Sequence, residues 1–256
     1  MDLTYHEPGF IKKMTPGLYE TYVNLGIDPE KELIEVAPTV HFFMGGLNID
    51  TQWQTEVAGL FGAGEVTGGM HGANRLSQNA LAEILVSGYM AGRNAAIYSK
   101  ENKDVHLNPK LIDHEVNMIQ EIMDQKEGLP PSQVRKELRD VMNTNVGVYR
   151  TEESLMEGLR KIESLEKTKV RITSKSKYMN RELLEAIENK NMFTTAKTVI
   201  LSALERKESR GAHFRSDYPE TDNENYLVNI IVRKNKDEFI IDKEPVSLEV
   251  LGLEVE

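Results

Sequence analysis

Apolar positions recur at helical spacing in several stretches of the chain, and each stretch predicts a helix. The first covers residues 10–25, and Gly26 follows it where a C-cap glycine is typical. A face of small residues runs along residues 77–97 and predicts a helix packed tightly on a sheet or a cofactor. Further amphipathic helices, which together predict a helical bundle, are expected at residues 113–125, 132–144, 152–165, 180–189 and 193–209.

Strand patterns occur at two places. Residues 59–66 are an apolar run punctuated by glycine, which predicts a buried strand of an α/β sheet. Apolar and polar residues alternate at residues 226–232 and 238–241, with polar residues 234–237 between them. This second pattern predicts a terminal β-hairpin.

Composition changes near residue 100. Eight of the 18 glycines lie between Gly45 and Gly72, whereas the later part is charged and poor in glycine. Turn signals at residues 128–131 separate the predicted helices of this later part. We therefore expect two domains, residues 1–100 and residues 101–256.

Charge and cysteine content exclude several kinds of function. The net charge of -10 argues against non-specific binding of nucleic acid, which needs clustered Lys and Arg. The 256 residues contain no cysteine, so this chain can bind neither an iron–sulfur cluster through Cys nor a flavin through a Cys linkage. No apolar run reaches the roughly 20 residues that a membrane-spanning helix needs, and the expected location is the cytoplasm.

Candidate chemistry gathers in the glycine-rich part of the chain. His41 precedes the glycine pair Gly45 and Gly46, where backbone can approach a flat ligand. Arg75 ends a glycine-rich loop that leads into a helix N-terminus, and its planar guanidinium suits a carboxylate. Glu65 follows the predicted strand and could accept a hydrogen bond from a ribose or ribityl hydroxyl. Taken singly, His41 also fits a structural role, and Arg75 also fits a surface ion pair.

The combination of motifs resembles the flavoproteins of the fumarate reductase, succinate dehydrogenase and L-aspartate oxidase family. The resemblance covers nearly the whole chain and rests on residues 41–46, 59–65, 71–76, 138–142, 146–150 and 208–219. It implies α/β plus α architecture: the C-terminal portion of an FAD-binding Rossmann-like domain, then a helical bundle domain with a terminal β-hairpin. Residues 1–100 would hold the end of a capping region and this part of the FAD domain, and residues 101–256 the helical domain.

The resemblance also implies roles for individual residues. His41 and Arg75 match positions that bind the carboxylates of the substrate. The positions expected to contact FAD are Glu65, Ala80, Leu81, Gly45, Gly46 and Asn74. Ala80 departs from the usual Ser of the family, which removes a hydroxyl but keeps the backbone N–H. The implied activity is hydride exchange between FAD and succinate or fumarate. No residue of this chain is assigned as the proton donor, and no metal site is expected.

Two features of the family are missing from the sequence. It has no Gly-x-Gly-x-x-Gly fingerprint for the FAD pyrophosphate, and it lacks the capping domain with its proton-donor Arg. The expected partners are therefore an N-terminal flavoprotein half that supplies both, a dicarboxylate substrate and an iron–sulfur subunit. Through such partners the chain could also lie on the inner face of a membrane.

Three alternatives remain open at this point. The chain could be the product of a split gene or a truncated fragment. It could be half of an L-aspartate oxidase instead of a fumarate reductase or succinate dehydrogenase. It could also be a non-catalytic module that uses the helical domain for assembly, and the basic cluster Arg210, His213 and Arg215 is expected to make interdomain or partner contacts.

Overall fold

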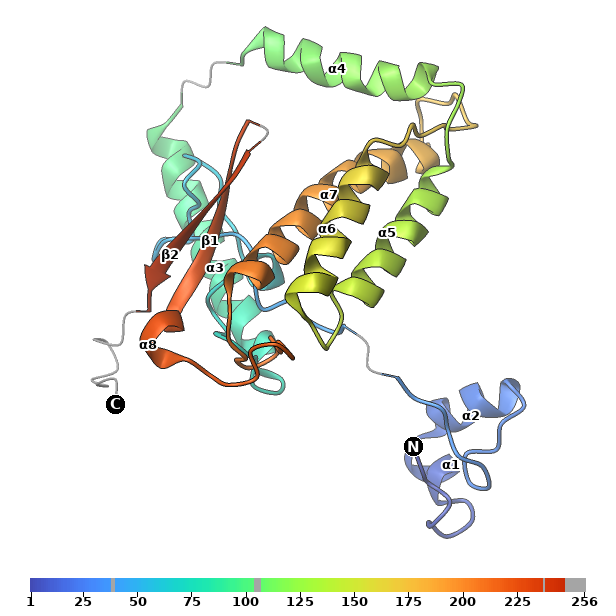
Figure 1. The fold of residues 1–256 in the computed structure, drawn as a ribbon. Coiled ribbons are helices and arrows are strands. Elements are labelled where there is room, and N and C mark those ends of the chain that lie inside the picture. Colours follow the sequence, from blue (N-terminus) through green and yellow to red (C-terminus); the bar gives the residue numbers. More distant parts are fainter. Residues whose placement is uncertain (38–39, 104–106, 237, 247–256) are drawn as a thin grey trace. The chain divides into compact units, whose positions relative to one another are not determined.

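The computed structural model describes residues 1–37, 40–103, 107–236 and 238–246. The chain divides into two compact units, Met1–Phe42 and Phe43–Glu256 (Figure 1). In the described residues, helices dominate and the strands form one two-stranded antiparallel sheet. The predicted division at residue 100 falls inside the second unit, and it stays a prediction.

The first unit contains two short helices where the sequence predicted one. Helix α1 (Phe10–Met14) ends before Pro16, and α2 (Pro16–Asn24) starts at that proline. The residue before a proline disfavours the helical conformation, and Thr15 has φ −138° and ψ 64°. Gly26 has φ +83° and its N–H donates to the Val23 carbonyl, so the predicted C-cap glycine is confirmed.

The predicted strand at residues 59–66 is wrong. In its place the chain forms an isolated antiparallel bridge between Gln54 and Phe61, and then the 3₁₀ turn η1 (Gly64–Val66). A buried parallel strand needs a neighbour along its length. Among the described residues this run has one isolated bridge and no paired strand, so the apolar run has no sheet to join.

Helix α3 (Asn79–Glu101) follows the glycine-rich loop and confirms the predicted long helix. Its buried residues are Ser87 and Ala91, and the helix contacts η1. Ser87 Oγ accepts a hydrogen bond from Gly64 N–H at 3.1 Å, which fixes α3 on η1. A small side chain is needed there because backbone comes this close.

The helical bundle is confirmed. Helices α5 (Pro131–Asn145), α6 (Glu152–Glu166) and α7 (Arg181–Glu205) lie side by side (Figure 1). Their apolar faces share a core made of Val134, Leu138, Val146, Leu155, Ile162, Leu165, Phe193, Ala196, Ile200 and Ala203. Helix α4 (Pro109–Asp124) joins through its last turn, where Ile122 and Met123 pack with Ile172 and Ala186.

Helix α7 is continuous, although the sequence predicted a break between residues 189 and 193. Asn189 is the last residue of the first predicted helix, and asparagine has a low helix propensity. Its side chain is buried, donates to the Pro131 carbonyl at 2.8 Å and accepts from Arg135 Nε at 3.0 Å. Asn189 thus joins α7 to the start of α5 without ending the helix.

The terminal hairpin is confirmed as β1 (Val228–Asn235) and β2 (Glu238–Pro245), which begin after the short helix α8 (Asn223–Tyr226). The strands pair antiparallel, and Val232 lies opposite Ile241. The hairpin packs on α7. Of the predicted turn, Asp237 lies outside the described residues.

The described helices include none that combines the length and the apolar character required to cross a membrane.

Candidate functional site

Two backbone segments cross closely at the start of the candidate site. Leu47 N–H donates to the Val66 carbonyl at 2.8 Å, and Gly68 N–H donates to the Leu47 carbonyl at 3.0 Å. A Cβ on Gly46 would lie 2.7 Å from the Thr67 carbonyl carbon, and one on Gly68 would lie 3.0 Å from Gly46 N. Gly46 is therefore needed for packing within the chain, whereas Gly45 has open space beside it.

Glu65 holds the segment that leads to the glycine pair. It lies in η1, and its Oε1 accepts a hydrogen bond from Phe43 N–H at 2.9 Å. The side chain is exposed. The contact between Glu65 and a cofactor hydroxyl stays a prediction.

The glycine-rich loop carries His71 and the candidate cation Arg75. Arg75 is half-buried and its Nε is shielded from solvent, as are both ring nitrogens of His71. Asn74 between them is exposed. Gly69 and Gly72 have φ of +89° and +56° with nothing near the missing Cβ, so the loop turns sharply beside open space.

The N-terminus of α3 directly follows this loop. Its N-cap residue, Gln78, has φ +63° and makes no side-chain hydrogen bond to the helix. Ala80 is half-buried in the first turn, and Leu81 beside it is exposed. The first N–H groups of a helix and its dipole favour an acceptor or an anion. Ala80 and Leu81 thus stand where such a ligand would meet the helix.

His41 belongs to the first unit and is exposed there, whereas Arg75 belongs to the second unit. A joint grip of His41 and Arg75 on one substrate stays a prediction.

Glu83 is a feature that sequence reasoning missed. It lies in α3, one turn before the buried Ser87. Both of its carboxylate oxygens are shielded from solvent, and no described residue gives them a hydrogen bond. Such a group is costly unless a donor satisfies it, so these oxygens point to a donor from outside the described residues. A helical pattern does not mark an acidic residue on a packed face as special.

The residues present fit the ring side of FAD and not its phosphates. Open glycine backbone at Gly45, Gly69 and Gly72 leaves room for a flat group, and the α3 N-terminus offers backbone donors. A pyrophosphate would need the glycine-rich fingerprint between a strand and a helix. The sequence of this chain does not contain it.

The basic cluster of the helical region forms an internal network. Arg215 is fully buried, pairs with Asp217 through Nε at 2.7 Å and Nη2 at 2.8 Å, and donates from Nη1 to the Ala203 carbonyl at 2.7 Å. Glu208 is also fully buried and accepts from Arg210 Nε at 2.7 Å. These bonds join the end of α7 to the loop that follows it.

His213 is neutral within this network. Burial and the neighbouring charge of Arg150 lower the pKa of His213 to about 4. Its Nδ1 lies 3.0 Å from Arg150 Nη1, and its Nε2 lies 3.2 Å from the Arg206 carbonyl. Because a guanidinium can only donate, Nδ1 accepts and Nε2 carries the proton.

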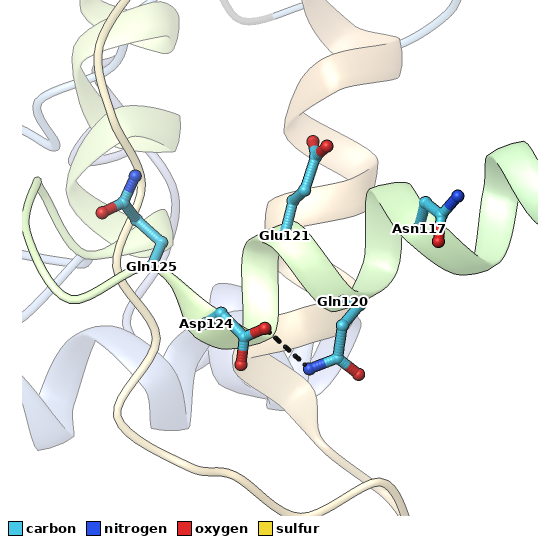
Figure 2. A pocket seen from close by; sticks show the side chains of 5 residues that line it. All are labelled: Asn117, Gln120, Glu121, Asp124 and Gln125. Atoms are coloured by element: carbon cyan, nitrogen blue, oxygen red, sulfur yellow. Dashed lines mark hydrogen bonds between the residues drawn. The ribbon is translucent and has the colours of Figure 1, made fainter.

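An open hollow on α4 is separate from these residues. Figure 2 shows it lined by Asn117, Gln120, Glu121, Asp124 and Gln125, with Gln120 Nε2 donating to Asp124 at 2.9 Å. None of the predicted site residues lines this hollow. Among the described residues, no three His, Asp or Glu side chains gather as metal ligands.

Comparisons with known protein families agree with this geometry. Residues 2–81 match the FAD binding domain model, and residues 135–256 match the model described as fumarate reductase flavoprotein C-term. The expectation of FAD is confirmed at this level of family. His41 and Arg75 both lie within the first match, and the buried network around Arg215 lies within the second.

Relatives of similar sequence are longer than this chain. An uncharacterized FAD-dependent oxidoreductase of Methanocaldococcus jannaschii is 39% identical over 236 residues, which cover 92% of this chain and 43% of the relative. The fumarate reductase flavoprotein subunit of Haemophilus influenzae is 37% identical over 218 residues, with coverage of 82% and 36%. The chain thus spans less than half the length of these curated relatives.

Solved structures confirm the fold class and the recognised family. Escherichia coli quinol fumarate reductase superposes with a TM-score of 0.86 at 32% identity, covering 96% of this chain and 43% of the other. Mycobacterium smegmatis Sdh1 in complex with UQ1 superposes with a TM-score of 0.85 at 31% identity, covering 98% and 44%. Sequence motifs, family models and fold agree, and the chain belongs to the family of fumarate reductase and succinate dehydrogenase flavoprotein subunits.

Proposed function

We propose that this chain contributes the flavin-ring and dicarboxylate side of an FAD-dependent site that interconverts succinate and fumarate. The observation that carries the proposal is the loop around Arg75, a half-buried residue that precedes the α3 N-terminus in the sequence. Open glycine positions at Gly69 and Gly72 flank the same loop. A cation, backbone donors and room for a flat group thus follow one another along a short segment.

Arg75 would bind one carboxylate of the substrate through two parallel hydrogen bonds. His41 would contact the other carboxylate of the substrate. FAD supplies the redox chemistry when it is bound. The residues of this chain would orient the substrate and shield it from water. Such positioning lowers the barrier of the reaction.

Cofactor contact would come from the α3 N-terminus and the segments beside it. The backbone at Ala80 and Leu81 would face the polar edge of the ring, with the Ala80 N–H as donor, a contact that the loss of the usual Ser hydroxyl leaves intact; the Leu81 N–H donates to the Gln78 carbonyl at 3.2 Å. Gly45 would lie against the ring, since its free side is open. Further contacts with the cofactor would come from Glu65, Gly46 and Asn74. Glu65 would make its contact while its Oε1 accepts the hydrogen bond from Phe43 N–H.

A second flavoprotein part would complete the site. Helix α3 exposes Leu81, Leu85 and Tyr89, with exposed fractions of 67%, 75% and 70%, at four-residue spacing along one face. A row of large apolar side chains at this spacing favours coverage by another protein surface. The same partner would supply a donor to Glu83, the pyrophosphate loop and the proton-donor Arg. Electron transfer would then run to an iron–sulfur subunit, and the assembly would be cytoplasmic or peripheral on the inner face of a membrane.

Replacement of Arg75 tests the proposal. In the FAD-loaded complex of this chain with the N-terminal flavoprotein part, Arg75→Ala should weaken binding of malonate and lower fumarate reduction at least about tenfold. The lost contact is a hydrogen bond to a charged group, worth roughly 1.5 to 3 kcal/mol. Arg139→Ala, at an exposed position of α5, is the matched control and should leave both unchanged.

The same assay separates the alternatives. Activity with L-aspartate in place of succinate would identify an L-aspartate oxidase half. A FAD-loaded complex in which Arg75→Ala and His41→Ala change no activity would support a non-catalytic assembly module and contradict the proposal. Failure of the complex to bind FAD at all would count against it as well.

A further inference from the structure

The turn at Arg210–His213 reaches from the helical region to the glycine-rich loop. Ala212 N–H donates a hydrogen bond to the Ala73 carbonyl at 3.0 Å. Arg210 and His213 pair across the turn, with N–H to carbonyl distances of 2.8 and 3.0 Å. Gly211 has φ +57° at the first central position, as in a type II′ turn. The tip of a tight turn thus touches the backbone two residues before Arg75.

The approach is close enough to require glycine. A Cβ on Gly211 would overlap the Ala73 carbonyl oxygen and would lie 2.5 Å from the Ala73 carbonyl carbon and 2.8 Å from its Cβ. Cβ atoms in proteins do not come this near to backbone, so any side chain at residue 211 must push the Ala73 segment away. Only a residue without a Cβ can hold the present distance.

The base of the turn is rigid. Ser209 Oγ accepts from Arg215 N–H at 2.9 Å and donates to the Tyr218 carbonyl at 2.8 Å. Arg150, from the connection between α5 and α6, donates from Nε to the Gly147 carbonyl at 3.0 Å and reaches the His213 ring through Nη1. Because these partners are half-buried or buried, the turn has a fixed position on the helical bundle.

We propose that the turn Arg210–His213 is a positioning element for Arg75. Its hydrogen bond to the Ala73 carbonyl fixes the loop that presents the guanidinium to the substrate. The inference rests on the proposed role of Arg75 in binding a carboxylate. It adds that the helical region sets the substrate affinity from a distance, through Gly211 and Ala212. None of these residues touches the substrate, so the role is one of position.

Hydrogen–deuterium exchange of the full chain is the direct test. Gly211→Ala should speed amide exchange across residues 69–76 about tenfold, the equivalent of one lost hydrogen bond. The matched control is Gly128→Ala: Gly128 also has positive φ, +119°, and a Cβ there would lie 2.9 Å from Lys169 Cβ. Like Gly211→Ala, this control introduces a Cβ at a positive φ and a steric overlap with a neighbouring segment. It should speed exchange near residues 128 and 169 only.

Affinity for a dicarboxylate gives the second measurement. In the FAD-loaded complex, Gly211→Ala should weaken malonate binding about ten- to a hundredfold, because a displacement near 1 Å costs up to this much. The flavin spectrum without malonate should stay as in wild type. Gly128→Ala should keep the wild-type affinity.

The exchange measurements test the positioning role of the turn, and the Arg75→Ala complex tests the proposed function. Unchanged exchange at residues 69–76 in folded Gly211→Ala would overturn the proposal. If that variant does not fold, Arg150→Met takes its place, and it should speed exchange at residues 69–76 by a smaller factor; no change there would be equally fatal. An Arg75→Ala complex with wild-type malonate affinity would instead refute the proposed function, whatever the exchange data show.

Discussion

The neutral imidazole of His213 gives the folded chain a dependence on pH. Its pKa is about 4 in the folded state and near its ordinary value of 6.5 when the chain unfolds. Between these values the unfolded chain binds more protons, so stability rises with pH across the interval. The contribution is complete above pH 6.5 and is lost as the pH falls towards 4.

We expect the urea midpoint of the chain to fall as the pH is lowered from 6.5 to 4, and His213→Gln to flatten this part of the curve. Val134→Ala is the control, because it removes buried apolar volume from the core and should lower the midpoint at every pH by a similar amount. A curve of unchanged steepness in His213→Gln would show that other groups cause the fall.

The residue types in the sequence predicted the candidate site residues but not the packing contacts around them. His41, Arg75 and Glu65 were found because a cation, an imidazole and a carboxylate stood beside glycines in recognisable motifs. Glu83 was missed, because solvent shielding of its oxygens depends on packing that no local pattern records. The contact of Gly211 with Ala73 was missed for the same reason: a positive φ is suggested by glycine, but its partner lies far away along the chain.

The helices followed the sequence wherever periodic apolar positions and caps agreed. Thr151 shows this well: its side chain accepts from Ser154 N–H at 3.1 Å and closes a capping box at the start of α6. The wrong predictions came from residues whose partners are remote. The first predicted helix stopped at Asn189, whose buried amide donates to the Pro131 carbonyl within a continuous helix, and residues 59–66 looked like a strand but form one isolated bridge, between Gln54 and Phe61.

The buried amide of Asn189 has two hydrogen-bond partners on α5. Asn189→Ala should lower the free energy of unfolding by roughly 1 to 3 kcal/mol, because the Pro131 carbonyl and Arg135 Nε lose a buried partner. Asn191→Ala, at an exposed position of the same helix, should change it by less than about 0.5 kcal/mol. Equal effects in a urea titration would show that the buried amide adds nothing.

The second unit joins the two regions that match different family models. Besides the contact of Ala212 with Ala73, Arg233 on β1 donates from Nε to Glu56 at 3.0 and 3.1 Å. One link comes from the turn after α7 and the other from the hairpin. Residues matched to the FAD binding domain are thus held by residues matched to the C-terminal model.

The exposed face of α3 makes a prediction about assembly. Leu85→Lys should change the stability of this chain by less than about 0.5 kcal/mol, since the side chain is in solvent. It should nevertheless weaken association with the N-terminal flavoprotein part, measured by titration calorimetry. Lys100→Glu near the end of the same helix is the control for altered charge. Undiminished association of Leu85→Lys would move the contact surface away from α3.

Gly211 also constrains how the family can vary. Any side chain at this position must be matched by a shift of the backbone at Ala73, so neither position can drift alone. Positions 73 and 211 should therefore covary among homologous sequences, and any loss of glycine at 211 should be accompanied by insertions, deletions or substitutions in the loop around 73. The backbone contact between these two segments would then be visible as a pair of coevolving positions.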